Sequence, residues 1–183
     1  MNLILASGSP RRRELLSLYT TDFTVCVSDF DESTVQADTP AQLVEQLARG
    51  KCLAVSAQHP GAVVIGCDTV VDVNGEVFGK PHSTEDAKRM LRALSGAAHE
   101  VHTGVCVSDG LRTESFVDSC KVTFFPIPEE EIDAYTATKE PYDKAGAYAI
   151  QGRAALWLDR LEGDYYTIMG LPVSRTARLL GRF

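Results

Sequence analysis

The 183-residue chain has no apolar run near the ~20 residues that span a bilayer. The apolar start gives way after four residues to the polar letters SGSPRRR, so we expect no signal peptide. The five cysteines are odd in number and contain no Cys-x-x-Cys pair, which argues against a disulfide framework or a zinc site. We therefore expect reduced, mostly buried thiols in a cytoplasmic protein with no membrane partner.

The chain also lacks an excess of positive charge. Its net charge of −7 argues against a nucleic-acid polymer as partner, whereas a small phosphorylated ligand needs only a local group of cations. It contains no P-loop, no His-Glu-x-x-His and no Gly-x-Ser-x-Gly motif. Without repeats or low-complexity tracts, residues 1–183 are expected to form one domain, at most two lobes around a shared core.

The most informative stretch of the sequence is Asn2–Leu16, which combines a strand, a turn and a helix start. A short apolar strand leads into a Ser-Gly-Ser turn, and a helix follows with Ser9 as N-cap and Pro10 at its first position. Arg11, Arg12 and Arg13 then fall in the first helical turn, where partial positive charge already disfavours cations. An anion such as a phosphate explains them; on the local sequence alone, a solvated basic helix face explains them equally well.

A second informative stretch is the β-branched run Ala62–Val73, which predicts a strand buried on both faces. Asp68 interrupts this run beside Thr69, and a buried carboxylate needs a partner or a metal. We favour a functional Asp68 over one that caps a strand bulge. Lys80, in a Gly-Lys-Pro segment, is either a positioned phosphate contact or an ordinary loop lysine. Taken alone, Lys51 is a surface lysine on a helix.

The remaining periodicity predicts a mixed α/β fold. Expected helices are 10–19, one opening at Pro40, one from Ser83 to Gly96, 128–138 and 172–180. Expected strands are 3–5, 23–28, 62–73, 76–78 after an Asn74-Gly75 hairpin turn, 99–108, 112–125 and a covering strand within 154–163. His99 and His102 lie on opposite faces of one strand, and no acid or cysteine is expected to complete a metal set with them. Near the C-terminal end, Glu140–Gly152 places Gln151 among small residues that leave room for a ligand ring.

Six segments in register resemble one family: LILASGSPRRRELL, GCDTVV, GKP, LSG with V-x-TGV, EPYDKAGAYAIQG and GLP. Together they are similar, nearly end to end, to the Maf family of nucleoside triphosphate pyrophosphatases. The resemblance implies an elongated mixed β-sheet flanked by helices, with two lobes and a central cleft, like the inosine triphosphate pyrophosphatases. A homodimer is left open.

The resemblance also implies roles. The expected catalytic residues are Asp68 as proton acceptor with Lys80, Lys51 and Glu32. The expected substrate-binding residues are Ser7, Ser9, Arg11, Arg12, Thr69 and Gln151. A divalent cation, Mg²⁺ or Mn²⁺, is expected because the candidate ligands, Asp68 and Glu32, are oxygen donors.

Arg11, Thr69 and Gln151 match the branch that hydrolyses dTTP and UTP to the monophosphate and pyrophosphate, limiting incorporation of wrong nucleotides. Modified pyrimidine nucleotides are a variant of this hypothesis, and a septation regulator that acts by binding is the alternative. A primary amide can pair with the imide edge of uracil or thymine, so Gln151 is the expected base reader.

Overall fold

The computed structural model describes residues 2–183, and the chain divides into two compact units. The first unit contains the chain up to Thr69 together with Thr103–Asp118 and Gly170–Phe183; the second contains Val70–His102 and Ser119–Met169. The strands form one mixed seven-stranded sheet in the order β2-β1-β3-β5-β6-β7, with β4 paired to β3. Three long strands contribute residues to both units: β3 (Val63–Val73), β5 (Ala98–Ser108) and β6 (Thr113–Phe124).

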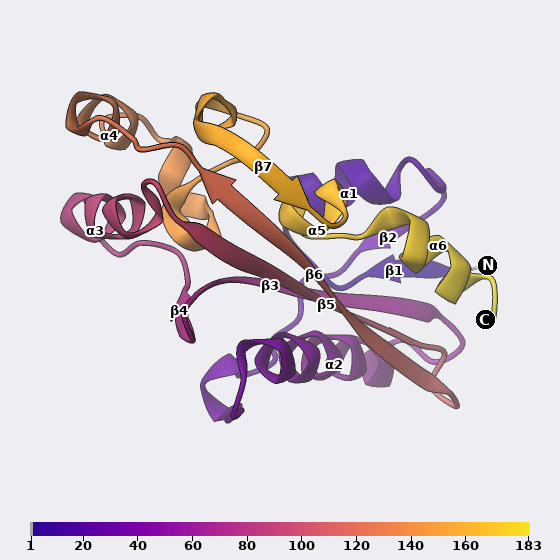
Figure 1. Ribbon diagram of the computed structural model, residues 1–183. Coiled ribbons are helices and arrows are strands. Elements are labelled where there is room, and N and C mark those ends of the chain that lie inside the picture. The colour runs from indigo at the N-terminus through magenta and orange to yellow at the C-terminus, as the bar shows by residue number, and fades with distance from the viewer. Residues whose placement is uncertain (1) are drawn as a thin grey trace. The chain divides into compact units, whose positions relative to one another are not determined.

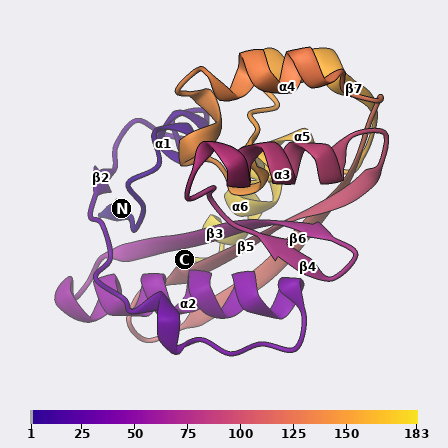
Figure 2. The same cartoon turned by 90° about the vertical axis from the view of Figure 1, so that its left-hand side faces the viewer.

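The first unit adds two short strands and three α-helices, namely β1 (Leu3–Leu5), β2 (Thr24–Val25), α1 (Pro10–Leu16), α2 (Pro40–Gln58) and α6 (Val173–Leu180), with a 3₁₀ turn at Glu32–Thr34. β1 pairs in parallel with both β2 and β3. Helix α2 covers one face of these strands, and α1 and α6 lie on the other (Figures 1 and 2). The unit is therefore a layered α/β structure built around β1 and β3.

Two strand glycines let α2 approach the sheet closely. A Cβ atom on Gly66 would lie 2.2 Å from the carbonyl oxygen of Ala48, and one on Gly104 would lie 2.3 Å from that of Val44. The apolar side of α2 then packs on alternate strand residues. The buried cluster is Ile4, Ala6, Ala48, Cys52, Val55, Ala62, Val64 and Cys106. This close approach fixes which α2 residues face β3.

The second unit adds β4 (Glu76–Phe78), β7 (Leu158–Glu162), α3 (Thr84–Leu94), α4 (Glu129–Thr136) and α5 (Tyr165–Met169), with 3₁₀ turns at Glu140–Asp143, Ala145–Ala147 and Arg153–Trp157. Helices α3 and α4 lie side by side (Figure 2). An edge-to-face group of aromatic rings forms the local core, with His99, Phe124, Tyr148, Tyr135 and Trp157. Trp157 is thus a core residue.

The mixed α/β fold and most element positions agree with the sequence prediction, with three differences. α1 ends at Leu16 instead of residue 19, and α5 was not predicted. The strand predicted for residues 23–28 shrinks to Thr24–Val25. It is an edge strand whose neighbour β1 has only three residues, so there is little backbone to pair with. The expected cleft between two lobes stays a prediction.

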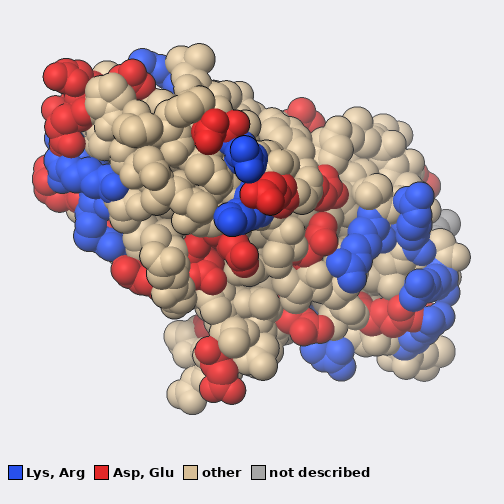
Figure 3. Space-filling model, in the orientation of Figure 1, with Lys and Arg blue, Asp and Glu red and all other residues tan. Residues whose placement is uncertain are grey.

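Charges of both signs are interspersed on the surface. On the face in Figure 3, Lys and Arg gather over α6 at the right, with acids among them. Arg175 pairs with Asp118 at 3.3 Å, and Arg182 pairs with Glu114 at 3.0 Å. Four of the five cysteines are buried, as predicted, and none of these five forms a disulfide bond. Within residues 2–183, no helix combines the length and apolarity that a bilayer crossing needs.

Candidate functional site

Asp68 and Lys51 form a short ion pair in the first unit. The Nζ atom of Lys51 lies 2.6 Å from Oδ1 of Asp68 and 3.0 Å from Oε1 of Glu32. The side chains of Lys51 and Asp68 are only 15% and 12% exposed, whereas that of Glu32 is 56% exposed. The structure therefore brings together three of the four predicted catalytic residues, with one ammonium group between two carboxylates.

Each member of this cluster is placed by a different element. Asp68 lies on β3, two residues after Gly66, and Lys51 lies on the stretch of α2 that faces β3. Glu32 begins the 3₁₀ turn that Asp31 caps by accepting the backbone N–H of Ser33. Because a buried carboxylate without a counter-charge is costly, the Lys51 ammonium explains how Asp68 is tolerated in an apolar strand.

The loop that carries Glu32 packs against α2 at Gly50. A Cβ atom on Gly50 would lie 2.4 Å from the ring of Phe30, too close for any side chain. Gly50 precedes Lys51 directly, and Phe30 lies two residues before Glu32. The ring of Phe30 packed over Gly50 therefore positions the Glu32 carboxylate beside the Lys51 ammonium.

Cys67, the neighbour of Asp68, is fully buried. Burial raises the pKa of its thiol to about 11. A protonated, inaccessible thiol is a poor nucleophile, so the Asp68 carboxylate is the stronger candidate of these two neighbours for a catalytic group.

The predicted phosphate-binding stretch is organised by Arg12. Its guanidinium donates from Nε to the carbonyl oxygen of Gly170 at 2.9 Å, from one terminal nitrogen to Oγ of Ser7 at 3.1 Å, and from the other to Oγ1 of Thr69 at 3.0 Å. Thr69 also shares a 2.9 Å hydrogen bond with Thr103. Three of the five donors of Arg12 thus hold the β1–α1 turn, β3 and the segment before α6 together.

Ser9 caps α1 as predicted, accepting the backbone N–H of Arg12 at 3.4 Å, and Pro10 occupies the first turn. Beside the Ser-Gly-Ser turn lies a surface pocket of about 350 Å³. Its lining residues are Ser7, Gly8, Ser9, Pro10, Arg13, Glu14, Ser17 and Val25. Arg13, to which the family motif gives no role, contributes a cation to this pocket, and Arg11 is half-buried.

Lys80 and Gln151 belong to the second unit, and both side chains are exposed. The segments that carry them are joined by a hydrogen bond in which the backbone N–H of Gly146 donates to the carbonyl oxygen of Gly79 at 3.0 Å. The Gly-Lys-Pro segment and the Glu140–Gly152 segment are therefore neighbours within this unit.

The space beside the two glycines near Gln151 is filled by protein atoms, contrary to the sequence interpretation that they leave it for a ligand ring. A Cβ atom on Gly146 would lie 2.8 Å from Val71, and one on Gly152 would lie 1.8 Å from a carboxylate oxygen of Glu140. That carboxylate accepts hydrogen bonds from the hydroxyl of Tyr135 at 2.9 Å and from the backbone N–H of residue 153 at 3.1 Å. These glycines therefore allow close packing by other protein side chains, and this packing holds the segment that carries Gln151 in place.

Two contributors to the Arg12 network were not identified from the sequence. Thr103 supports Thr69, and the carbonyl oxygen of Gly170 anchors Arg12. Gly170 adopts a φ of +102°, and a Cβ atom there would lie 3.2 Å from Oγ1 of Thr69. Both lie in motifs noted above, V-x-TGV and GLP, and that is the signal through which they could have been found.

The family model described as "Maf-like protein" matches residues 2–183. The chain belongs to the Maf family. A protein named "dTTP/UTP pyrophosphatase" from Symbiobacterium thermophilum is 50% identical over 99% of this chain and 93% of its own length. A protein of the same name from Bacillus cytotoxicus is 47% identical over 98% and 94%.

Two solved structures share the fold of this Maf-family chain. A HAM1 protein from Coxiella burnetii has a TM-score of 0.56 at 12% identity and covers all of both chains. The Ham1 protein of Staphylococcus aureus has a TM-score of 0.51 at 18% identity, over 68% of this chain and 72% of its own. These likenesses concern the fold, and they confirm the mixed α/β class predicted above.

Proposed function

We propose that this Maf-family protein hydrolyses dTTP and UTP to the nucleoside monophosphate and pyrophosphate. The observation that carries the proposal is the Asp68–Lys51 pair at 2.6 Å, in the same unit as the Arg12-organised turn with Ser7 and Thr69. The names of the relatives, at up to 50% identity over nearly the whole chain, supply the substrates. By limiting such nucleotides, the activity keeps wrong bases out of nucleic acids.

In the proposed reaction Asp68 is the general base. Lys51 donates to Oδ1 of Asp68 and so fixes the plane of the carboxylate. The other carboxylate oxygen takes a proton from water as the water oxygen bonds to the α-phosphorus. The bond from phosphorus to the bridging α–β oxygen breaks, and pyrophosphate leaves with that bond's electrons.

Polyanion binding is assigned to the serines and arginines of the opening stretch. Ser7 and Ser9 offer hydroxyl groups, and Arg12 has two N–H donors beyond the three that hold the fold together. Arg11 and Lys80 are further proposed phosphate contacts, and Lys51 neutralises charge near the base. Such cations stabilise the charge that develops on the leaving pyrophosphate.

A divalent cation, Mg²⁺ or Mn²⁺, is part of the proposal. The donor set fits, because the carboxylates of Glu32 and Asp68 converge on one positive group, the Lys51 ammonium. Carboxylate oxygens suit these hard cations, and the cation would supply further charge neutralisation at the phosphates. Glu32 and Asp68 are the residues that would hold it.

Base selection is assigned to Gln151. Uracil and thymine present an N–H donor between two carbonyl acceptors, and an amide can meet that edge with one acceptor and one donor. Cytosine presents an unprotonated ring nitrogen and an amino group, which would require the amide to turn over. The Glu140 carboxylate packs against Gly152, the residue after Gln151, and so holds the backbone of Gln151 in place.

The test is a nucleotide panel assayed separately for pyrophosphate and for phosphate, with hydrolysis of dTTP repeated in ¹⁸O-labelled water. We expect pyrophosphate as the only phosphorus-containing product besides the monophosphate, with dTTP and UTP ahead of the purine nucleotides. Since pyrophosphate is the leaving group, the label must appear in the monophosphate; label in the pyrophosphate would mean attack at the β-phosphorus and would contradict the step above. Stepwise release of phosphate through the diphosphate would contradict the proposal.

A further inference from the structure

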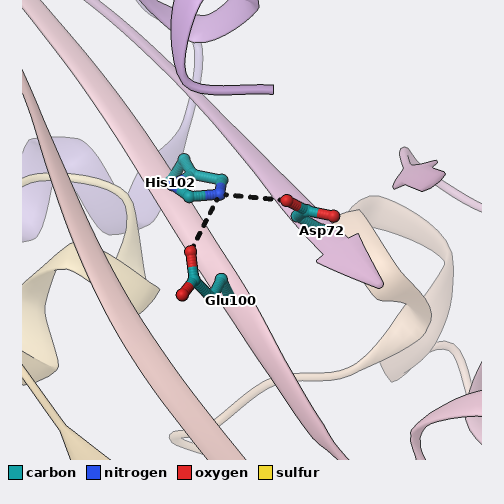
Figure 4. A group of neighbouring side chains, drawn as sticks. All are labelled: Asp72, Glu100 and His102. Atoms are coloured by element: carbon teal, nitrogen blue, oxygen red, sulfur yellow. Dashed lines mark hydrogen bonds and ion pairs between the residues drawn. The ribbon is translucent and has the colours of Figure 1, made fainter. Parts of the chain in front are cut away.

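Three side chains with metal-binding atoms meet in the second unit, although the sequence interpretation expected no acid to complete a metal set with His102. Asp72 lies on β3, and Glu100 and His102 lie two residues apart on the adjacent strand β5, so both point from the same face. Figure 4 shows both carboxylates directed at the imidazole of His102. The ligand atoms of the three residues all lie within 4.8 Å of one another.

Two of the three separations between these atoms equal those of ligands around one ion. Nε2 of His102 lies 3.4 Å from Oδ2 of Asp72 and 3.5 Å from Oε2 of Glu100. Charge-assisted hydrogen bonds are shorter, about 2.7–2.9 Å. Ligands about 2.1 Å from a tetrahedral Zn²⁺ lie roughly 3.4 Å apart, which is the spacing found here.

Two of the three side chains are held in place from behind. Nδ1 of His102 forms a 2.7 Å hydrogen bond with the hydroxyl of Ser119 on β6, which directs Nε2 toward the carboxylates. Oδ1 of Asp72 accepts the backbone N–H of Gly75 at 2.6 Å, which leaves Oδ2 for the cluster. Such outer partners orient the ligands of established metal sites.

Charge and access also fit a cation. Among residues 2–183, the ion pairs of Asp72 and Glu100 both go to His102, and neither carboxylate is paired with a lysine or an arginine. The side chain of His102 is 7% exposed and that of Asp72 is 17% exposed, whereas Glu100 is 53% exposed. Two of the candidate ligands are therefore largely shielded from solvent, whereas the exposed Glu100 side chain lets an ion reach the cluster.

We propose that Asp72, Glu100 and His102 bind one Zn²⁺ ion. One imidazole and two carboxylates are a donor set that Zn²⁺ accepts, with water as the fourth ligand. The imidazole disfavours Mg²⁺ and Ca²⁺, which prefer oxygen ligands. None of these residues belongs to the Glu32–Lys51–Asp68 cluster, and the proposal does not depend on the proposed function.

The test uses the purified full chain, freed of metal and without nucleotide. Zn²⁺ is titrated in competition with a chromophoric chelator, and Co²⁺ serves as a spectroscopic probe of the ligands. We expect one Zn²⁺ per chain, and visible Co²⁺ bands of tetrahedral type without a thiolate charge-transfer band. Glu100→Gln should weaken Zn²⁺ binding by at least about 10-fold. Glu130→Gln, an exposed glutamate on α4 in the same unit, is the matched control and should bind as the wild type does.

His102→Gln provides a second variant that should lose the Co²⁺ bands, with circular dichroism as the check on folding. The Glu100 side chain is half exposed, so Glu100→Gln should fold even if His102→Gln does not. Absence of stoichiometric Zn²⁺ binding by the wild type would overturn the proposal. Equal Zn²⁺ affinity of the wild type and Glu100→Gln would also overturn it, because the ion would then lie elsewhere.

Discussion

His99 makes the stability of the second unit depend on pH. Its ring is 3% exposed, packs edge-to-face on Phe124 and Tyr148, and shares a 2.8 Å hydrogen bond with the hydroxyl of Tyr148 through Nε2. Nδ1 is buried without a hydrogen-bond partner among the described residues. Burial lowers the pKa of His99 from 6.5 to about 4, because the charged ring would lose its hydration.

The sign follows from linkage. Between pH 6.5 and about 4 the unfolded chain binds a proton at His99 that the folded chain does not, so stability falls as the pH falls through this window. The full difference between these two pKa values corresponds to about 3 kcal/mol. Between pH 7 and pH 5 the loss of unfolding free energy from this one group is about 2 kcal/mol.

The assay is urea unfolding at pH 7 and pH 5 for the wild type and for His99→Phe. Phe leaves the Tyr148 hydroxyl without its partner at both pH values, so that cost cancels in the difference between them. We expect the wild type to lose about 2 kcal/mol more than His99→Phe between the two pH values. His82→Gln, at an exposed histidine, is the control and should behave as the wild type does. Equal losses in the wild type and His99→Phe would show that His99 does not cause the loss of stability at low pH.

Three further substitutions test how the candidate site is built. Gly50→Ala should gain up to about 1 kcal/mol of helix propensity but lose more stability through the clash of the new methyl group with Phe30. It should also lower kcat, because the loop that carries Glu32 is displaced. Urea unfolding measures the first effect and kcat the second; an unchanged unfolding free energy and kcat would contradict the packing of Phe30 on Gly50. Thr69→Val should cost about 1–3 kcal/mol in unfolding free energy because Arg12 loses an acceptor, and an unchanged Tm would show that this bond contributes little. Gln151→Ala should lower kcat/KM for dTTP and UTP by about ten- to a hundred-fold, with a smaller change for poor substrates; an equal loss for all nucleotides would remove its role in base selection.

Local patterns were sufficient to predict most of the elements. Ser9 and Pro10 start α1, Ser83 caps α3, and Asn74-Gly75 turns β3 into β4 with φ values of +53° and +88°. Each signal acts within a few residues, which is why it can be read without tertiary structure. The cost of burying Asp68 likewise predicted that the residue needs a partner.

The identity of that partner depends on tertiary packing. Lys51 reaches Asp68 because Gly66 and Gly104 bring α2 against the sheet, and no local pattern sets that distance. The main-chain acceptor of Arg12 lies 158 residues away at Gly170. His102 shows the same limit, because its acids come from β3 and from its own strand β5.

The same limit explains the wrong interpretation of the glycines near Gln151. A small residue predicts close approach of some atom, but not which one. At Gly152 the approaching group is the carboxylate of Glu140, and at Gly146 it is the side chain of Val71. The roles of Lys80 and Gln151 stay predictions, as do those of the other predicted site residues.

In the proposed reaction the Asp68 carboxylate, held by Lys51, is the base in nucleoside triphosphate hydrolysis. The most direct measurement is kcat for dTTP with Asp68→Asn, alongside circular dichroism and Tm. Asparagine keeps an oxygen to accept the Lys51 N–H and cannot take the proton. We expect a folded variant whose kcat falls by at least about 10²-fold; a folded variant with near-normal turnover would show that Asp68 is not the base.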